Sequence, residues 1–405
     1  MTAPSIRRTL GELRSELDGL TDGALNERPL SLAEYQRFAV KTYRGHARGE
    51  ERLDFLLLGL FGEVGSLLSE LKKKQRDRSS YVAYNSSSVE ETGDVLWYLA
   101  NVVAHCGSSL GVLAGYPGPE GAVRPLLDLQ PQGSLFQAPA SPERVQASLL
   151  TLAGTVGTLI ARHKSFAGKE HMAADLGSIL HQLLSASTDA QISLAEAAHA
   201  NLEKLMARWP IRPTWGPLLD ATDLPSEQFP RLMRVEFKEL TVGQRLYVSQ
   251  SMNGVNIGDR LSDNSVEEDD YRFHDVFHLA FAGILGWSPV LRSMLSLRRR
   301  SRPDFDEVQD GARAKITEEG ISNWVFSHGL RHDAFEHVES LDFALLKTIG
   351  QMVKGYEAEK LMPWMWEHAI LEGFRVFRFL RQHRGGVVTA NRTRRSLSVE
   401  IVSTP

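Results

Sequence analysis

The stretch LLGLFGEVGSLLSELKKK, residues 57–74, decides the fold of the N-terminal half. Its apolar residues recur at three- and four-residue spacing, which predicts an amphipathic helix. Glu63 lies in the middle of the apolar part, between two glycines. A carboxylate inside an apolar helical run needs a partner, and a metal ion is one that suits it. The stretch therefore predicts a helix that also carries a candidate metal ligand.

The same spacing extends over most of the 405 residues. It predicts helices over 31–43, 52–77, 88–114, 144–164, 172–208, 270–297, 312–330 and 340–382. Only the end of the chain has the pattern of strands, where VVTAN (387–391) and SLSVEIV (396–402) flank a polar turn. The expected fold class is therefore mainly α: a helical bundle, followed by a largely helical C-terminal domain that ends in a β-hairpin.

The composition predicts a cytoplasmic protein. The N-terminus lacks the apolar core of a signal peptide, and the longest dense apolar stretch, residues 55–62, is too short to span a bilayer. The single cysteine, Cys106, rules out an internal disulfide and fits a reducing compartment. The formal net charge of −4 argues against a surface built for nucleic acid. We therefore expect neither a membrane nor a nucleic acid as a partner.

An internal repeat divides the N-terminal half into two blocks. The stretch at 57–74 resembles LLTLAGTVGTLIARHKS at 149–165, and EETGDVLWYLANVV at 90–103 resembles ADLGSILHQLLSAS at 174–187. Six prolines between 115 and 142, and five between 210 and 231, interrupt the helical pattern. The expected domains are a first helical block at 30–114, a connector at 115–142, a second block at 143–210 and a C-terminal domain at 232–405.

Two further acids, Glu91 and Asp94, lie one turn apart in the apolar run of the next predicted helix. At about 100° per residue, one face of this helix carries Glu91, Asp94, Tyr98 and Asn101, and one face of the preceding helix carries Glu63, Ser66, Glu70, Lys73 and Lys74. Magnesium takes hard oxygen ligands and shares its shell with substrate phosphates. Lysines can neutralise the remaining polyphosphate, and a carboxylate can serve as the base for an attacking water. The alternative is that these acids form only a solvated helix face.

At these residues the sequence resembles the MazG family of all-α nucleotide pyrophosphohydrolases. The family pattern is a Glu-rich first helix and an ExxD motif on the next helix. It stands here as Gly62-Glu63-Val64-Gly65-Ser66 and Glu91-Thr92-Gly93-Asp94. Tyr35-Gln36 is similar to the family's first-helix signature, and NLEKLMARWP (201–210) is similar to the way these domains end. The resemblance covers residues 30–210 and makes the first block the catalytic one.

The resemblance implies an enzyme that hydrolyses nucleoside or deoxynucleoside triphosphates to a monophosphate and pyrophosphate, with Mg²⁺ or Mn²⁺, as a homodimer. It implies metal ligands at Glu63, Glu91 and Asp94, and substrate contacts at Gln36, Lys73, Lys74, Trp97, Tyr98 and Asn101. The family's second acid on the first helix is Ser66 here. We therefore name Glu70 as a candidate replacement ligand.

The second block lacks most of these acids. Thr155, Asp175 and Ser178 stand where the first block has Glu63, Glu91 and Asp94. We do not expect this block to bind a metal in the same way. It either supplies the silent half of a duplicated arrangement or is simply a helical pair that completes one domain.

The C-terminal half has polar groups of its own inside apolar helices. His274 and His278 lie one turn apart in RFHDVFHLAFAGILGWSPVLR (272–292), with Asp275 between them, and DGARAKITEEGIS (310–322) carries Glu318 and Glu319. Such a histidine pair can bind a transition metal, and the carboxylates could complete its shell. Without a clear third ligand, a hydrogen-bonded buried His274–Asp275 pair is the favoured alternative. Both stretches resemble a C-terminal extension of some fused MazG-type proteins.

Basic residues gather after one predicted helix, in the run Arg298-Arg299-Arg300-Ser301-Arg302. Because the helix dipole favours cations at a C-terminus, we expect a solvated helix end, with a phosphate or nucleic-acid contact as the alternative.

Three functions stay open. The first is the triphosphate pyrophosphohydrolase. The second is a regulatory module, with phage defence as one setting, in which the first block senses nucleotides and controls an active site in the C-terminal domain. In the third, the C-terminal domain is the principal enzyme and acts on a nucleoside or a nucleic acid.

Overall fold

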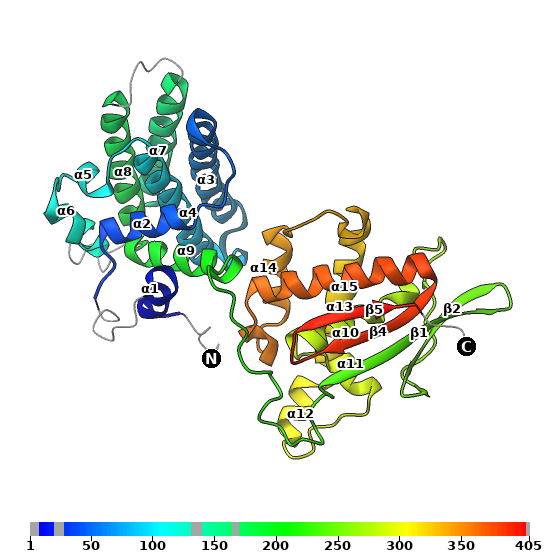
Figure 1. The fold of residues 1–405 in the computed structure, drawn as a ribbon. Helices are drawn as coiled ribbons and strands as arrows, with labels where there is room; N and C mark the ends of the chain where they lie inside the picture. Colours follow the sequence, from blue (N-terminus) through cyan, green and yellow to red (C-terminus); the bar gives the residue numbers. More distant parts are fainter. Residues whose placement is uncertain (1–7, 20–27, 131–139, 164–169, 402–405) are drawn as a thin grey trace. The chain divides into compact units, whose positions relative to one another are not determined.

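The stretch around Glu63 forms α3 (Gly49–Asp77) in the computed structural model. The structure describes residues 8–19, 28–130, 140–163 and 170–401. The chain divides into two compact units between Arg212 and Pro213, within the proline-rich segment 210–231 (Figure 1). The mainly α fold class is confirmed.

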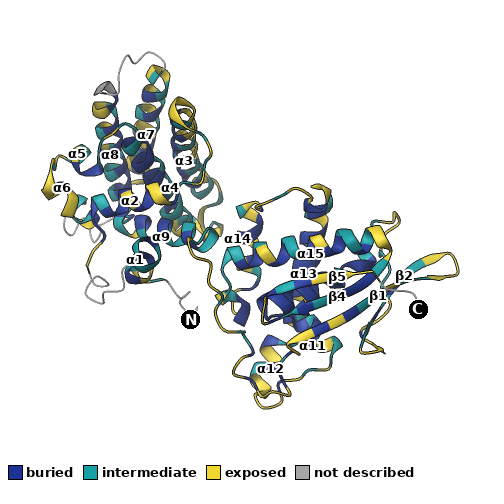
Figure 2. Cartoon of the chain, viewed as in Figure 1, coloured by how far each residue is buried: buried dark blue, intermediate teal, exposed yellow. Residues whose placement is uncertain are grey.

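The N-terminal unit is a helical bundle. Its elements are α1 (Leu10–Asp18), α2 (Leu32–Lys41), α3, η2 (Arg78–Ser80), α4 (Tyr84–His105), α5 (Leu110–Leu113), α6 (Pro119–Val123), η3 (Leu126–Leu129), α7 (Pro142–His163), α8 (Glu170–Asp189) and α9 (Leu194–Arg208). The two repeated blocks form the hairpins α3–α4 and α7–α8, which pack together through α3 and α7, while α9 and α2 pack against α4. Leucines and valines of both hairpins share one hydrophobic core (Figure 2). The second block thus contributes to the same core as the first.

Two of the predicted N-terminal helices are shorter than expected. The segment 172–208 is interrupted after Asp189, where Gln191 takes a positive φ and Ser193 caps α9. The segment 88–114 stops at His105, because Gly107 takes a positive φ and Ser109 caps the short α5. Between 115 and 130 the predicted connector holds only the short helices α6 and η3, and residues 131–139 lie outside the described residues.

Among the described residues, one helix, α7, is long and apolar enough to cross a membrane by length and composition. A single helix of this kind is weak evidence for a membrane span, because core helices of soluble proteins pass the same criterion. Here α7 packs against α8 and α3 within the bundle.

The C-terminal unit combines helices with an antiparallel sheet. Its strands are β1 (Leu232–Val242), β2 (Arg245–Met252), β3 (Val255–Asn256), β4 (Gly385–Asn391) and β5 (Ser396–Glu400), in the order β3-β2-β1-β4-β5. Its helices are η5 (Tyr271–Phe273), α10 (Asp275–Ala280), η6 (Phe281–Leu285, a π-helical turn), α11 (Pro289–Met294), α12 (Pro303–Gln309), α13 (Ala312–Leu330), η7 (Asp333–Phe335), α14 (Phe343–Met352), η8 (Glu357–Lys360) and α15 (Pro363–His383). The helix α15 packs against α10 and against both strands of the closing hairpin.

The predicted closing hairpin, β4–β5, is confirmed, but it belongs to a larger sheet. Strands β1 to β3 were not predicted from the sequence. In β1, Met233, Val235 and Phe237 alternate with more exposed residues, as a half-buried strand requires. Its partner β4 lies about 150 residues further along the chain, whereas its other partner, β2, follows directly across the turn Gly243-Gln244 and is a local signal that was missed.

Two predicted helices of this unit are also wrong as single helices. The segment 270–297 is split into η5, α10, η6 and α11, because Gly286 takes a positive φ and Pro289 begins α11. The segment 340–382 is split into α14 and α15, with Gly355 at a positive φ and Pro363 at the start of α15. These breaks turn the histidine-bearing helix α10 into a short element within the core.

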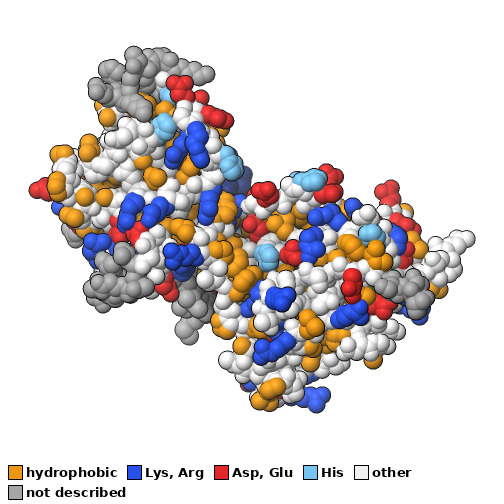
Figure 3. Space-filling view, in the orientation of Figure 1, with side chains coloured by type: hydrophobic (Ala, Val, Ile, Leu, Met, Phe, Trp, Pro, Cys, Tyr) orange, Lys and Arg blue, Asp and Glu red, His pale blue; other side chains and the backbone are white. Residues whose placement is uncertain are grey.

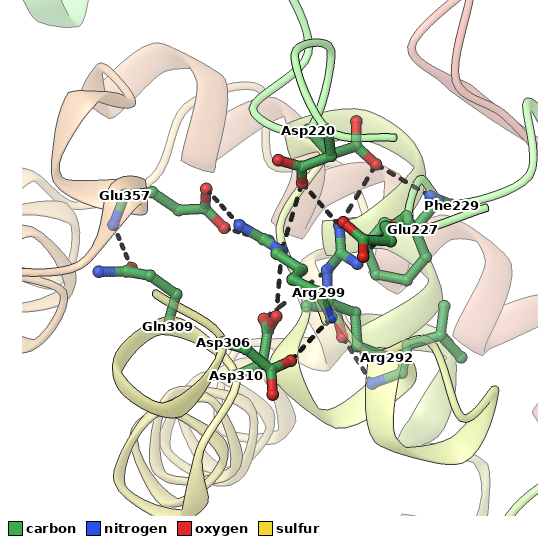
Figure 4. A network of polar contacts seen from close by, with 12 residues as sticks. Asp220, Glu227, Phe229, Arg292, Arg299, Asp306, Gln309, Asp310 and Glu357 are labelled. Atoms are coloured by element: carbon green, nitrogen blue, oxygen red, sulfur yellow. Dashed lines mark hydrogen bonds and ion pairs between the residues drawn. The ribbon is translucent and has the colours of Figure 1, made fainter. Parts of the chain in front are cut away.

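The arginine run does not form a solvated helix end throughout, so this expectation is wrong for Arg299. Its guanidinium is 1% exposed and contacts Glu357 at 2.5 Å and Asp310 at 3.0 Å. Nearby, Arg292 is equally buried and approaches Asp220 (Figure 4). These buried ion pairs connect α11, α12 and η8 within the C-terminal unit. Arg298, in contrast, is exposed to solvent.

Candidate functional site

The three predicted acids of the N-terminal unit come together. Glu63 projects from α3, while Glu91 and Asp94 project from α4, which packs along α3. One carboxylate oxygen from each lies within 4.8 Å of the others, and all three residues are partly exposed. Residues about 30 positions apart are thus joined into one carboxylate cluster, which we call the α3–α4 cluster.

The electrostatics of the α3–α4 cluster favour a cation. Burial, together with the Asp94 carboxylate, raises the pKa of Glu63. Burial and the Asp94 and Glu63 carboxylates raise the pKa of Glu91 to about 8. Burial also raises the pKa of Asp94, although Lys204 opposes this effect. Since like charges at this separation disfavour ionisation, a bound divalent cation would stabilise the ionised carboxylates.

Two residues of α9 that the sequence analysis assigned no role complete the surroundings of Asp94. Lys204 Nζ lies 2.6 Å from Asp94 Oδ1 and 3.6 Å from Glu90 Oε1. Asn201 Nδ2 donates to Asp94 Oδ1 at 2.7 Å. Both residues lie in the stretch 201–210, which was noted only for its resemblance to a domain ending.

A glycine lets α9 approach this closely. A Cβ at Gly93 would lie 2.5 Å from the carbonyl oxygen of Ala197 and 2.9 Å from Asn201 Cβ. Such contacts are closer than van der Waals packing allows, so a larger residue would push α9 away from α4. Gly93 therefore helps to place Lys204 and Asn201 beside Asp94.

Aromatic residues flank the α3–α4 cluster. Burial, with the Glu63 and Asp94 carboxylates, raises the pKa of Tyr98 to about 12. Trp97 contacts Tyr98 edge-on at 4.9 Å and donates its indole N–H to Thr42 Oγ1 at 2.9 Å. Tyr98 is thus a cluster neighbour, while Trp97 is mostly buried in the core.

The remaining predicted substrate contacts make hydrogen bonds within the fold. Gln36 Nε2 donates to the Ser108 carbonyl at 3.0 Å, and its Oε1 accepts from the Leu110 N–H at 2.8 Å. Asn101 is fully buried and donates to the carbonyls of Ala39 and Trp97. These two side chains hold helices and loops together.

The structure places Glu70 and the two lysines further along α3. Glu70 accepts from Lys73 Nζ at 2.6 Å and from the Tyr81 hydroxyl, and it is absent from the metal-capable groups of the described residues. Lys74 Nζ lies 5.8 Å from the ring centre of Tyr84. With a rise of 1.5 Å per residue, Lys73 starts about 15 Å along the helix from Glu63. The nearest cation to the cluster is instead Lys204.

The second hairpin has no equivalent cluster within the described residues. Thr155 Oγ1 donates to the Thr151 carbonyl at 2.9 Å, and Ser178 Oγ donates to the Ala174 carbonyl at 3.1 Å. Both hydroxyls are thus hydrogen-bonded to their own helices.

The C-terminal unit has a second cluster, at the start of α10 and in α13. His274, Asp275 and His278 each bring a ligand atom within 4.8 Å of the others, and all three are buried. His274 Nε2 lies 3.1 Å from Asp275 Oδ1, so these two side chains are close neighbours in the cluster. Glu318 and Glu319 also contact His278, which means that all five second-site candidates meet. We call these five residues the α10–α13 cluster.

The pKa values of the two histidines in the α10–α13 cluster are shifted in opposite directions. Burial is the largest cause lowering the pKa of His274, with the nearby His278 adding to it. For His278, burial also lowers the pKa, but the adjacent Glu318 carboxylate more than compensates, so its pKa is raised well above the usual range.

Comparison with protein families recognises this second unit. Residues 215–403 match the family model of the MazG C-terminal domain. The matched stretch covers the whole sheet and the α10–α13 cluster, and it supports the resemblance noted for RFHDVFHLAFAGILGWSPVLR. The match does not extend to α3 and α4. No curated protein and no solved structure matches the chain.

Proposed function

We propose that the N-terminal unit hydrolyses nucleoside or deoxynucleoside triphosphates to a monophosphate and pyrophosphate, using Mg²⁺ or Mn²⁺. The observation that carries this proposal is the α3–α4 cluster, in which Glu63, Glu91 and Asp94 converge from two helices with raised pKa values. Carboxylate oxygens are the ligands that Mg²⁺ prefers, and it shares its shell with substrate phosphates. The presence of a MazG C-terminal domain in the same chain supports a nucleotide-related role.

The residues of the chain can be given separate tasks. Glu63, Glu91 and Asp94 would hold the metal ion, which would polarise the phosphoryl oxygens. Water would add to the α-phosphorus, the bond to the bridging oxygen would break, and pyrophosphate would leave. A carboxylate oxygen of the cluster that does not bind the metal would accept the proton of the water.

Lys204 supplies the positive charge that the sequence analysis assigned to Lys73 and Lys74. Its ammonium lies beside Asp94 and Glu90, and could meet a phosphate at the same place. Tyr98, at the edge of the cluster, is the proposed contact for the base or sugar.

Exposed apolar residues on α3 support the expected homodimer. Phe55, Leu58 and Phe61 recur at three-residue spacing and are 46%, 72% and 47% exposed. Such side chains gain free energy when a second surface covers them. A copy of the chain that packs on this face would lie beside the helix that carries Glu63.

Neither a membrane nor a nucleic acid is part of the proposal, and we place the reaction in the cytoplasm. On the face drawn in Figure 3, Lys and Arg side chains lie in separate groups among acidic and apolar ones. A protein that follows a nucleic-acid backbone would gather them into a continuous basic surface.

The test is a panel of nucleoside and deoxynucleoside triphosphates with Mg²⁺ or Mn²⁺, scored for pyrophosphate against orthophosphate. The double variant Glu91→Ala, Asp94→Ala should abolish pyrophosphate release. The matched control is Asp175→Asn, which changes the acid equivalent to Glu91 in the second hairpin and should leave the rate unchanged. Release of orthophosphate, or equal activity of the double variant, would contradict the proposal.

A nucleotide-sensing module is the second candidate function, and Ser66 is the observation that favours it. The hydroxyl is a poorer ligand for Mg²⁺ than a carboxylate, and Glu70 does not replace it in the cluster. This candidate predicts that a triphosphate binds in the presence of Mg²⁺ without being hydrolysed.

A further inference from the structure

Four potential ligand atoms converge in the α10–α13 cluster. His274 Nε2 lies 3.1 Å from Asp275 Oδ1 and 3.8 Å from Glu319 Oε2. His278 Nε2 lies 3.9 Å and 3.5 Å from the same two oxygens. The two imidazole nitrogens and Asp275 Oδ1 therefore lie within 4.8 Å of one another, and Glu319 Oε2 approaches both nitrogens from α13.

These separations fit the coordination shell of a metal ion. Zinc binds imidazole nitrogen and carboxylate oxygen at about 2.0–2.2 Å, which sets tetrahedral ligand atoms about 3.4 Å apart. The four separations, from 3.1 to 3.9 Å, bracket that value. His274, Asp275 and His278 already lie close together, and rotation of the partly exposed Glu319 side chain would bring its carboxylate onto the same ion.

Hydrogen bonds on the outer side of each histidine orient its Nε2 toward this point. His278 Nδ1 lies 2.8 Å from Glu318 Oε1. His274 Nδ1 lies 2.9 Å from the Tyr271 carbonyl oxygen. Metal-binding histidines almost always donate their other ring N–H to a carboxylate or a carbonyl in this way. Both rings of the pair thus have the orientation that a metal site requires.

The supporting carboxylate is itself held in place. Glu318 is fully buried and accepts from Ser288 Oγ at 2.6 Å and from the Val290 N–H at 2.7 Å. Asp275 is held by Gln250, whose Nε2 donates to Oδ2 and leaves Oδ1 directed at the histidines. The side chains around the four ligand atoms are therefore preorganised.

One of the ligand atoms lacks a hydrogen bond. His278 is fully buried, and among the described residues its Nε2 has no hydrogen-bond partner. A buried polar atom left in this state costs free energy, so a partner is expected. Glu319, whose side chain is 45% exposed, opens the same point to solvent and provides access for an ion.

We propose that this MazG C-terminal domain binds one divalent first-row transition-metal ion through His274, His278, Asp275 and Glu319. Imidazole nitrogen suits Zn²⁺, Fe²⁺ and related ions, whereas Mg²⁺ takes oxygen ligands almost alone. The site is therefore chemically distinct from the α3–α4 cluster. Glu318 is a positioning residue that orients His278, and the solvent-exposed side of Glu319 leaves room for water on the ion.

The test uses the full chain, stripped of metal with a chelator and titrated with Co²⁺, whose visible absorption reports nitrogen and oxygen coordination. The titration is done in the Glu91→Ala, Asp94→Ala background, so that the first cluster cannot contribute. We expect one Co²⁺ per chain, an increased melting temperature on binding, and displacement of Co²⁺ by Zn²⁺ but not by Mg²⁺.

Variants of exposed and of buried residues are compared, so that a loss of metal binding can be distinguished from a loss of folding. The Glu319 side chain is 45% exposed, so the Glu319→Gln variant should fold normally and should bind the metal ion more weakly. Glu318→Gln should weaken binding about 10- to 100-fold, the usual effect of losing an outer hydrogen-bond partner. His278→Ala should abolish binding. The matched control is His328→Ala, because His328 and His332 form another pair at four-residue spacing outside any metal-capable group of the described residues.

Two results would overturn the proposal. One is the absence of Co²⁺ or Zn²⁺ binding in the folded chain, which would leave a protonated His278 held between Glu318 and Glu319 as the role of the cluster. The other is binding that His328→Ala weakens as much as Glu319→Gln does. Neither result depends on pyrophosphate release, so this site and the proposed hydrolase function can fail separately.

Discussion

Lys204 Nζ lies 2.6 Å from Asp94 Oδ1 and joins α9 to the carboxylates of α4. The contact connects residues 110 positions apart. It provides the only cation that the structure places directly against a predicted metal ligand of the α3–α4 cluster, as far as the described ion pairs show.

Replacing Lys204 by Met should therefore lower kcat/KM for the triphosphate. A hydrogen bond to a charged group contributes about 1.5–3 kcal/mol, which corresponds to about 10- to 100-fold in rate. Lys204→Arg keeps the charge and should retain part of the activity. Steady-state kinetics with saturating Mg²⁺ measure the effect, and equal kcat/KM values for the wild type and Lys204→Met would exclude a role for this ammonium.

The raised pKa of Glu91 predicts how stability depends on pH without metal. Its pKa is about 8 in the folded chain against an ordinary value of 4.5. The folded state therefore binds the proton more tightly, and stability falls as pH rises from 4.5 through 8. Melting temperatures with a chelator should decline over this window, whereas saturating Mg²⁺ should reduce the decline. Glu91→Gln removes the titrating group and should flatten the curve. A metal-free curve that rises between pH 5 and 8 would contradict the shift.

The N-terminal helices could be predicted because their periodicity is local. The α3–α4 cluster was predicted for the same reason, since Glu63, Glu91 and Asp94 belong to short motifs. Lys204 was missed because the signal that connects it to Asp94 is tertiary: Gly93 admits α9, and no spacing along the chain shows this. Lys73 and Lys74 lie on the predicted helix face, but a lysine from another helix is closer to the acids.

The C-terminal unit was harder to predict, and strand β1 shows why. Its alternation of buried and exposed residues ends at Phe237 and includes several charges, and although β2 follows it across a short turn, its other partner β4 is at the other end of the unit. The convergence of Glu319 on His278 is likewise a product of the tertiary fold, because α13 brings a carboxylate from 41 positions away to the histidine pair. The sequence offered the five residues as candidates but not their arrangement.

Leu58 tests the proposed homodimer. Its side chain is 72% exposed on α3, between Phe55 and Phe61. Leu58→Glu would place a charge on the proposed contact surface and should shift the chain from dimer to monomer in sedimentation experiments, with the melting temperature of the monomer little changed. The control is Val266→Glu, at a fully exposed apolar residue in the other unit, which should not alter the mass. A wild-type chain that sediments as a monomer would contradict the dimer outright.

Arg299 and Arg298 allow the stability contributions of a buried and an exposed ion pair to be compared. Arg299 is 1% exposed and pairs with Glu357, so Arg299→Ala leaves buried acids without a partner and should cost about 3–5 kcal/mol of unfolding free energy. Arg298 pairs with Asp306 but is 63% exposed, and Arg298→Ala should cost less than about 1 kcal/mol. Denaturant unfolding of the full chain, followed at the transition of the C-terminal unit, compares the two. Equal losses of unfolding free energy would show that the buried ion pairs of Figure 4 contribute no more to stability than an exposed pair does.

Gly59 controls where Tyr98 lies. A Cβ at this position would fall 2.1 Å from a ring carbon of Tyr98, so Gly59→Ala must displace the ring from the edge of the α3–α4 cluster. If Tyr98 contacts the base or sugar, this variant should raise KM more than it lowers kcat. Gly62→Ala is the matched control on the same helix, because its Cβ would meet nothing within 4 Å and the change should stabilise α3 by up to about 1 kcal/mol. Unaltered KM in Gly59→Ala, with the variant folded, would remove Tyr98 from the proposed binding site and leave it a packing residue beside Glu63.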